Sequence, residues 1–225
     1  GGISVTFDIH DIEKEVRRNF YAITFLAIFT TAGLVGLVYL FTSKFYRQLN
    51  EAREKMEVLA ITDELTGLYN RRHLLARFEE EFRRAKRLNN QLGFIIIDLD
   101  HFKKVNDRFG HLAGDEVLKA LAASVKESIR SYDILGRLGG EEFLVILPDT
   151  GFEETRRFAE RLRTRVKHRF DRESVLPEKV PVTISLGITV IHPDDESIGD
   201  ILRRADAGLY RAKTGGRDRV GSVRS

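Results

Sequence analysis

The sequence predicts an α/β domain of the α+β class, and three apolar segments carry that prediction. Residues 92–99 form a continuous apolar run, which is typical of a strand buried on both faces. Residues 133–147 read as two short strands that meet at Gly139 and Gly140, because paired glycines between apolar runs favour a tight turn. Another apolar segment at 182–191 predicts a further strand.

Helical patterns fill the intervals between these strands. A loop punctuated by Gly67 and Asn70 leads into the first helix, and Gly110–Asp115 leads into a later one. The predicted helices cover about Arg72–Asn89, His101–Phe109, Asp115–Arg130, Phe152–Arg169 and Ser197–Lys213. The resulting βαββαβ order predicts a ferredoxin-like sheet with helices on one face.

Composition limits the classes of protein and site that the chain can form. The chain has 225 residues, a net charge of +3 and no Cys. This length suits one globular domain of about 150–180 residues with additional segments. The absence of Cys excludes a disulfide framework and thiolate metal sites. The small basic excess does not indicate a nucleic-acid partner. Because the chain begins with Gly1 rather than Met, it is expected to be a fragment.

A long uncharged run near the N-terminus predicts one transmembrane helix. Residues 19–43 contain no charged side chain, and as a helix they would span about 37 Å, more than a bilayer core of about 30 Å. The alternatives are a buried core helix, for which the run is unusually apolar on every face, and a secretory signal, for which it is too long. Cations are slightly more numerous after the run than before it, which favours a cytoplasmic C-terminal side.

The segments flanking this run have patterns of their own. Residues 1–18 begin with strand-like alternation at Ile3–Ile9 and become helical, which suggests the end of an extracytoplasmic sensor segment. Residues 44–61 place apolar side chains on an a/d seam about two heptads long, and this favours a short dimeric coiled-coil stalk. The seam consists of Phe45, Leu49, Ala52, Met56 and Leu59. An amphipathic helix packed on its own domain is the alternative. The α/β domain would then occupy 62–225.

Acidic residues mark one end of the predicted sheet. Asp98 and Asp100 close the first strand, and Glu141 and Glu142 follow the hairpin turn. In a split βαβ sheet these two places are adjacent, so Asp98 would meet the glutamate pair. Three converging carboxylates would suit a hard cation such as Mg²⁺ or Mn²⁺. For the Gly-Gly-Glu-Glu segment alone, an ordinary solvated turn is the alternative.

Five motifs, in the expected order and spacing, resemble those of GGDEF domains. They are Asp63-Glu-Leu-Thr-Gly-Leu-Tyr-Asn-Arg-Arg72, Asp98-Leu-Asp-His-Phe-Lys-Lys-Val-Asn-Asp107, Gly110-His-Leu-Ala-Gly-Asp115, Gly139-Gly-Glu-Glu-Phe143 and Asp206-Ala-Gly-Leu-Tyr-Arg-Ala-Lys213. GGDEF domains are the diguanylate cyclases, which condense two GTP into cyclic di-GMP. The resemblance covers about residues 60–220 and implies a fold like that of nucleotide cyclases and polymerase palms.

The resemblance implies which residues act on the substrate. Asp98, Glu141 and Glu142 would be the catalytic carboxylates. Asp98 and Glu141 would bind two Mg²⁺ (or Mn²⁺) ions per active site, with help from the Leu99 carbonyl and Glu142. One ion would lower the pKa of a ribose 3′-hydroxyl, and the other would neutralise the α-phosphate and the departing pyrophosphate.

GTP would be held at its base and at its phosphates. Asn106 and Asp115 would read guanine, since a carboxylate accepts from N1–H and N2–H₂ and an amide addresses other edge atoms. Asp115 would also serve as N-cap of the following helix, a reading compatible with the first. Lys213 and Arg217 would bind the β- and γ-phosphates. The backbone amides of Phe102 and Lys103 would approach the triphosphate, and the Lys103 side chain could also contact it.

One domain would carry only half of the reaction. Each domain would hold a single GTP, so its 3′-oxygen must attack GTP bound to a second domain. A homodimer is therefore expected, and the stalk would raise the effective concentration of one domain near the other. The expected location is the bacterial inner membrane, with a single membrane pass and a cytoplasmic catalytic domain.

Arg130-Ser-Tyr-Asp133 lies at the position of the family's product-inhibition motif, Arg-x-x-Asp. The Arg130 guanidinium would bind a phosphate or guanine of cyclic di-GMP, Asp133 would accept from guanine, and Arg161 would add a contact. An ion pair at a helix end is the alternative.

Three positions depart from the family pattern. Glu141 replaces an Asp and retains the carboxylate, Gly208 stands where Ala is usual, and Asp218 stands where Asn is usual. Asp218 is expected to weaken contacts near Arg217. Two other functions stay open: a catalytically silent receptor that binds GTP or cyclic di-GMP, and a nucleotide cyclase or polymerase palm with another base preference.

Overall fold

The computed structural model describes residues 9–172, 175, 176, 178 and 180–223, and the side chains of 9–11 and 50–60 are not described. It divides the chain into two compact units, residues 1–57 and 58–225. The predicted strand at Ile3–Ile9 lies almost wholly outside the described residues. The helical prediction for Asp11–Arg18 is confirmed, because a single helix begins at Ile9.

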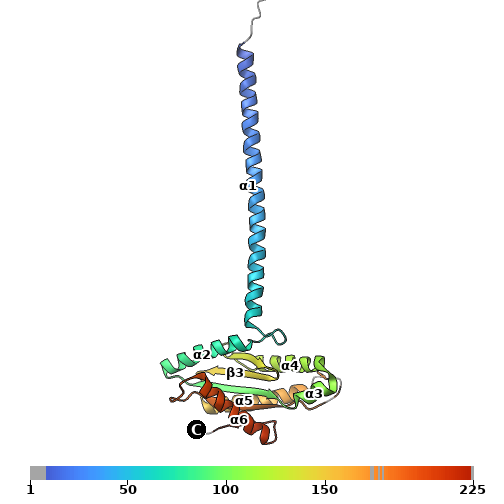
Figure 1. Cartoon of the computed structure of the whole chain (residues 1–225), viewed down its shortest axis with the longest axis vertical. Coiled ribbons are helices and arrows are strands. Elements are labelled where there is room, and N and C mark those ends of the chain that lie inside the picture. Colours follow the sequence, from blue (N-terminus) through green and yellow to red (C-terminus); the bar gives the residue numbers. More distant parts are fainter. Residues whose placement is uncertain (1–8, 173–174, 177, 179, 224–225) are drawn as a thin grey trace, which may run out of the picture. The chain divides into compact units, whose positions relative to one another are not determined.

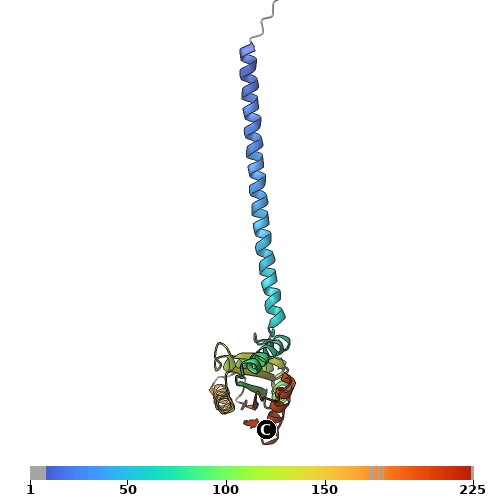
Figure 2. The same ribbon diagram turned by 90° about the vertical axis from the view of Figure 1, so that its left-hand side faces the viewer.

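The N-terminal unit consists of helix α1 (Ile9–Ile61), which also runs into the second unit (Figures 1 and 2). Within it, Ile12–Leu49 is long and apolar enough to cross a membrane. Hydroxyl groups in this stretch donate to carbonyls one turn earlier, Thr24 to Phe20 at 2.8 Å and Thr31 to Ala27 at 2.7 Å. These bonds satisfy the polar side chains locally, as a lipid environment requires. The helix is a candidate for both the membrane span and the stalk.

The second unit is a five-stranded sheet with the order β2-β3-β1-β4-β5. Strand β1 (Leu92–Leu99) lies in the middle and pairs antiparallel with both β3 (Glu142–Pro148) and β4 (Ile184–Val190). The hairpin strand β2 (Ile134–Gly139) pairs with β3 as predicted. Strand β5 (Val220–Ser222) was not expected; it is only three residues long and runs parallel to β4.

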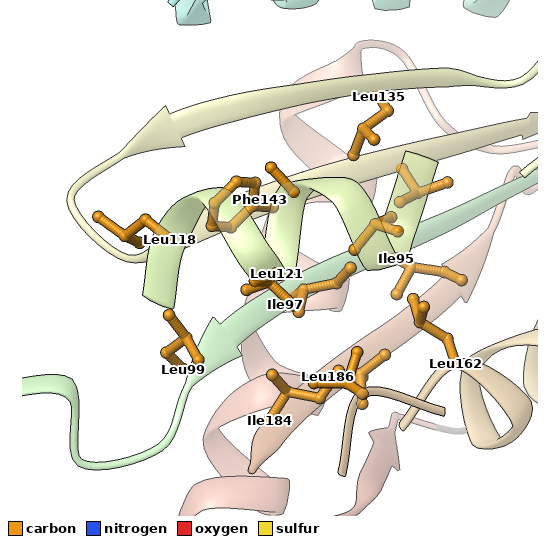
Figure 3. Close-up of a cluster of buried hydrophobic side chains, with 14 of the residues drawn as sticks. Ile95, Ile97, Leu99, Leu118, Leu121, Leu135, Phe143, Leu162, Ile184 and Leu186 are labelled. Carbon is orange, nitrogen blue, oxygen red and sulfur yellow. The ribbon is translucent and has the colours of Figure 1, made fainter. Parts of the chain in front are cut away.

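Helices cover both faces of the sheet, so the prediction of helices on one face is wrong. Alternate side chains of β1 enter two separate cores. Ile95 and Ile97 pack with α3 (Phe102–Phe109), α4 (His111–Lys126) and α5 (Phe152–Arg172), as Figure 3 shows in part. Phe94 and Ile96 pack with α2 (Arg71–Leu88) and α6 (Ile198–Thr214) on the other face.

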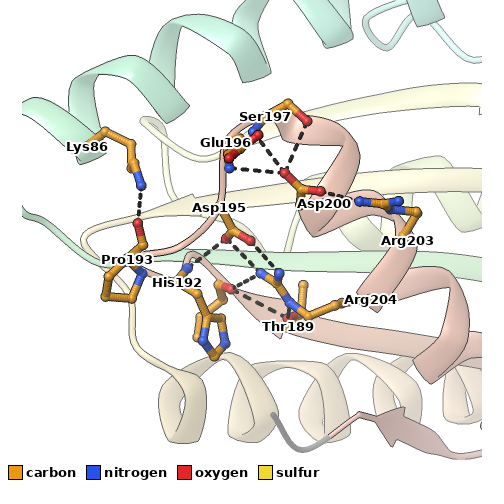
Figure 4. A network of polar contacts seen from close by, with 11 residues as sticks. Lys86, Thr189, His192, Pro193, Asp195, Glu196, Ser197, Asp200, Arg203 and Arg204 are labelled. Carbon is orange, nitrogen blue, oxygen red and sulfur yellow. Dashed lines mark hydrogen bonds and ion pairs between the residues drawn. The ribbon is translucent and has the colours of Figure 1, made fainter.

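A buried ion pair fixes the connection between β4 and α6 (Figure 4). Asp195 is 4% exposed and accepts from both terminal nitrogens of Arg204, at 2.8 Å for Nη2, and from the His192 backbone N–H at 2.7 Å. Arg204 also donates to the Val190 carbonyl at 2.9 Å. Asp200 accepts from the Ser197 backbone N–H and thereby caps the start of α6.

The departure at Gly208 has a packing reason. A Cβ atom at this position of α6 would lie 2.8 Å from the Gly221 carbonyl oxygen of β5. The absence of a side chain therefore lets the helix lie directly against the added edge strand.

Candidate active site

The hairpin turn and the end of β1 lie side by side, as predicted. Gly139 and Gly140 have φ angles of 147° and 54°, a backbone that L side chains rarely adopt. The turn they make starts β3 at Glu142, and the register of the sheet sets Glu142 directly opposite Asp98. Glu141 occupies the turn itself. The two glutamates are thus carried to the strand end that holds Asp98.

The three carboxylates form a region of concentrated negative charge. Burial, and then the negative charge of Asp98, raise the pKa of Glu141 and of Glu142, while Lys213 opposes both shifts. Burial likewise raises the pKa of Asp98, which is 3% exposed, against the opposing effect of Lys213. The Lys213 ammonium lies 2.7 Å from Asp98 Oδ2. One cation therefore offsets only part of the charge of three acids.

The donor set fits a hard divalent cation, with one correction to the expected geometry. Among the described residues, no three acidic, His or Cys side chains converge closely enough to form a complete metal cluster. Mg²⁺ is commonly held by one or two carboxylates together with waters and substrate phosphates, and Asp98 and Glu141 meet that requirement. The Leu99 side chain is buried in the core at 1% exposure, so only its carbonyl is left as a ligand.

The predicted guanine residues lie on two consecutive helices. Asn106 is on α3, Asp115 is on α4, and Gly114 of α4 lies against the Asn106 side chain. A Cβ at Gly114 would lie 1.9 Å from Asn106 Oδ1, and this buried oxygen has no hydrogen-bond partner among the described residues. Buried polar atoms are rarely left unpaired, so Asn106 is a ready acceptor for a ligand donor. The N-cap of α4 is Gly110, so the interpretation of Asp115 as a helix cap is wrong.

The residues predicted to approach the triphosphate begin α3. Phe102 is 7% exposed and anchors this helix in the core, whereas Lys103 beside it is exposed. The anchor fixes the backbone amides of the first helical turn, which have no partner within the helix itself. Such free amides are suited to bind phosphate oxygens.

The cations predicted to bind phosphate lie on α6 and on the loop after it. Lys213 is in the last turn of α6, and Arg217 follows with a φ of 63°. The positive charge of Arg217 also lowers the pKa of Asp98, so the loop is within electrostatic range of the acids. The expectation that Asp218 would weaken this region is wrong. Its carboxylate accepts from Arg163 at 2.7 Å and from Lys167 at 2.6 Å, both on α5.

The comparisons with known proteins agree with this arrangement. Residues 60–219 match the family model described as "Diguanylate cyclase, GGDEF domain". The chain belongs to the GGDEF family of diguanylate cyclases.

Relatives in this family are similar in both sequence and structure. A diguanylate cyclase of Vibrio cholerae is 41% identical over 189 residues, which are 84% of this chain and 57% of that protein. The chain therefore spans just over half the length of this relative. The coiled coil and GGDEF domain of DgcB from Caulobacter crescentus, in complex with c-di-GMP, match with a TM-score of 0.75 at 30% identity. That match covers 81% of this chain and 95% of the DgcB chain.

A solved relative also carries the Glu variant of the hairpin. The active GGEEF domain of a diguanylate cyclase from Vibrio cholerae matches with a TM-score of 0.64 and 41% identity. This match covers 69% of the present chain and 97% of that domain.

Within this GGDEF domain, the three residues predicted to bind product line one cavity. Arg130, Asp133 and Arg161 surround a space of about 250 Å³, and sequence reasoning missed Arg157, which lines it too. Asp133 accepts from the Arg130 backbone N–H at 2.8 Å, and the Arg130 guanidinium donates to the Tyr132 hydroxyl. Asp133 Oδ1 is buried without a partner among the described residues. The Arg130 guanidinium and the Asp133 carboxylate therefore do not form an ion pair with each other.

Arg137 is a second residue that sequence reasoning missed. It lies on β2 and donates to both oxygens of Asp63, at 3.1 and 3.2 Å, and to the Gly140 carbonyl at 3.0 and 2.7 Å. Asp63 in turn accepts from the backbone and hydroxyl of Thr66. Arg137 therefore joins the turn that follows α1 to the hairpin turn that carries Glu141. The only indication in the sequence was an Arg two residues before a glycine turn, and this pattern is not specific for such a contact.

Proposed function

We propose that this chain condenses two molecules of GTP into cyclic di-GMP and releases two pyrophosphates. The observation that carries the proposal is that Asp98, which Lys213 contacts at 2.7 Å, lies within electrostatic range of Glu141 and Glu142 at one end of a GGDEF sheet. In each half-reaction a ribose 3′-oxygen forms a bond to the α-phosphorus of the other GTP. The bond from that phosphorus to pyrophosphate breaks, and the hydroxyl proton is lost.

Asp98 and Glu141 would hold the two divalent ions, with the Leu99 carbonyl and Glu142 assisting. When bound, Mg²⁺ or Mn²⁺ lowers the pKa of the attacking hydroxyl and neutralises charge on the α-phosphate and leaving group. Burial raises the pKa of Asp98 and of Glu141, and the charge of Asp98 raises that of Glu141 further; this supports the assignment, because bound cations would stabilise the ionised carboxylates.

The other side chains would bind and orient GTP. Asn106 and Asp115 would pair with the guanine edge, and the unpartnered Asn106 oxygen supports that role. Lys213 and Arg217 would neutralise the β- and γ-phosphates. Lys213 would leave Asp98 to do so, which would free that carboxylate for metal.

Catalysis would require two domains facing each other, because one domain binds one GTP. The α1 residues 44–61 would supply the dimer as a parallel coiled coil, and Phe45 and Leu49 of that seam are exposed. Residues 19–43 would cross the bacterial inner membrane once, with residues 1–18 outside and the GGDEF domain in the cytoplasm, where GTP is found. Cyclic di-GMP bound at Arg130, Asp133 and Arg161 would inhibit the enzyme.

The test is to incubate the purified chain with GTP and Mg²⁺ and to measure cyclic di-GMP and pyrophosphate by chromatography. We expect product in a ratio of one cyclic dinucleotide to two pyrophosphates. Arg130→Ala should sustain synthesis at product concentrations that stop the parent protein. If neither protein forms cyclic di-GMP, the chain is not a cyclase.

A matched pair of variants tests the metal site. Glu141→Gln removes one ligand charge and should abolish turnover while the far-UV circular dichroism stays unchanged. Glu153→Gln, at an exposed glutamate at the start of α5, should leave turnover unchanged. Full activity of Glu141→Gln would remove Glu141 from the metal site.

A further inference from the structure

Asp100 lies two residues after Asp98, yet its contacts are of a different kind. It is 6% exposed, and both carboxylate oxygens are occupied by hydrogen-bond donors of the protein. Oδ1 accepts from the Ser185 hydroxyl at 2.7 Å. Oδ2 accepts from the Thr183 hydroxyl at 2.7 Å and from the Asp218 backbone N–H at 3.0 Å. A carboxylate held by three donors is not free to bind a metal.

The third donor belongs to the loop that carries Arg217. Arg217 and Asp218 have φ angles of 63° and 44°, so two successive non-glycine residues are left-handed. Such a backbone persists only where surrounding contacts hold it. The Arg217 N–H donates to the Ala212 carbonyl at 3.0 Å, and the Leu186 N–H donates to the Arg219 carbonyl at 3.0 Å. Between these two bonds, Asp100 holds the backbone of the loop from the sheet side.

The geometry points to Asp100 as a positioning residue for substrate phosphates; this inference rests on the proposed function. Asp98 and Asp100 leave the same strand end, one toward the glutamates and the other toward the loop. By accepting from the Asp218 N–H, Asp100 fixes the left-handed turn and hence the direction in which Arg217 leaves the loop. The phosphate-binding cation is thereby held in register with the metal-binding carboxylate.

The chemistry requires an acceptor oxygen at this position. Three donors converge on Asp100, and a buried donor without an acceptor is unfavourable. Asn could keep its oxygen toward the Thr183 hydroxyl and the Asp218 N–H, and its NH₂ group would face the Ser185 hydroxyl, which can rotate to accept from it. Asp100→Ala removes every acceptor, and the backbone N–H of Asp218 cannot rotate to find another. Asp100→Ala should therefore loosen the loop.

The first experiment measures nucleotide affinity without turnover. The probe is 3′-deoxy-GTP with Mg²⁺, which lacks the attacking hydroxyl, and calorimetry gives its dissociation constant. Asp100→Ala should weaken binding about tenfold or more, the effect expected for a lost hydrogen bond to a charged group. The control is Ser185→Ala, which removes a donor to the same carboxylate and leaves the Asp218 bond in place; it should change affinity less than about twofold. Equal losses in both variants would overturn the proposal.

A double-mutant cycle tests whether Asp100 acts through Arg217. Arg217→Ala alone should weaken 3′-deoxy-GTP binding, and adding Asp100→Ala to it should change affinity less than about twofold further. Fully additive losses would show that Asp100 does not act through Arg217.

Hydrogen exchange separates this inference from the function on which it rests. Amides of residues 215–219 should exchange at least about tenfold faster in Asp100→Ala than in the parent protein or in Ser185→Ala, since the Asp218 N–H loses its acceptor. Unchanged protection would overturn the positioning role even in an active enzyme. If exchange is faster in the Asp100 variant but the parent protein makes no cyclic di-GMP, the contact between Asp100 and the loop is supported and the cyclase function is rejected.

Discussion

Asn106 owes its position to a neighbour without a side chain. Gly114 lies on the next helix, and a Cβ there would lie 1.9 Å from Asn106 Oδ1 and 3.1 Å from the Phe102 ring. The Phe102 ring is held in the core, so the Asn106 amide would have to move. The position of the side chain proposed to bind guanine therefore depends partly on the glycine at 114.

Gly114→Ala should weaken GTP binding selectively. Displacing the Asn106 amide removes about one neutral hydrogen bond, so we expect the KM for GTP to rise about three- to tenfold. The KM ratio of GTP to ITP, which lacks the 2-amino group, should also change. Gly199→Ala is the control, because a Cβ at this helical position meets only the Ser197 hydroxyl, at 3.2 Å. Equal KM values for the two variants would show that Gly114 does not position Asn106.

The sequence predicted the two strand-end aspartates but could not separate their roles. Asp98 falls within β1, so pairing with β3 directs it to the hairpin. Asp100 falls beyond the strand, where its partners come from residues more than eighty positions away. Contacts over that separation leave no local pattern. Arg137 was missed for a similar reason, because its carboxylate partner Asp63 is 74 positions away.

Among the elements, the four longer strands of the sheet were predicted, and the errors lie at the margins of the sheet. The continuous apolar run of β1 indicates a strand buried on both faces, so helices were to be expected on both faces of the sheet. The prediction of helices on one face came from the analogy with a ferredoxin-like sheet. Helix α4 begins at His111 because Gly110, with a φ of 82°, ends α3 and starts α4 without an intervening loop. Strand β5 has three residues and depends on pairing with β4, so its own sequence gives too little signal.

The lead-in turn and the hairpin turn behave as one element through Arg137. Arg137→Ala would release the Gly140 carbonyl from two hydrogen bonds and leave Asp63, whose pKa is held low by Thr66 and Arg137 despite its partial burial, without its cation. We expect turnover to fall about tenfold and the free energy of unfolding to fall by about 1–3 kcal/mol. Arg156→Ala, which removes an exposed pair with Glu153, should change neither value appreciably. Normal turnover in Arg137→Ala would mean that the hairpin holds its shape alone.

The β4–α6 connection should contribute stability that depends on pH. Burial by itself raises the pKa of Asp195, but the Arg204 side chain and the His192 N–H outweigh it and hold the pKa below 3.8. The ionised form therefore stabilises the fold above the unfolded pKa, and this stability is lost as the pH falls through the lower folded value.

Asp195→Asn should lower the free energy of unfolding by about 2 kcal/mol at pH 7. The difference from the parent domain should stay constant down to about pH 5 and shrink below about pH 4. Urea unfolding of residues 58–225 at several pH values measures it, with Asp194→Asn as an exposed neighbouring control. A difference that grew toward low pH would have the wrong sign for this ion pair.

For the whole molecule, the central question is how a domain that is proposed to bind one GTP would complete a reaction between two. The α/β unit from Val58 onward has its own two cores and should fold without residues 1–57. What the N-terminal helix would add is proximity: two tethered domains meet at an effective concentration that free domains reach only at about millimolar levels. Deletion of residues 1–57 should therefore change how the rate depends on protein concentration and leave GTP binding by each domain unchanged.

We expect residues 58–225 to be soluble without detergent and to bind 3′-deoxy-GTP as the full chain does. Their specific activity should rise in proportion to protein concentration in the micromolar range, because productive encounters are then bimolecular. Fusing a parallel dimeric coiled coil to Val58 should restore a specific activity that is independent of concentration, and a monomeric helix of equal length should not. If the deleted protein has a constant specific activity over a hundredfold dilution, and sedimentation shows it to be monomeric, the stalk is not what brings the two GTP molecules together.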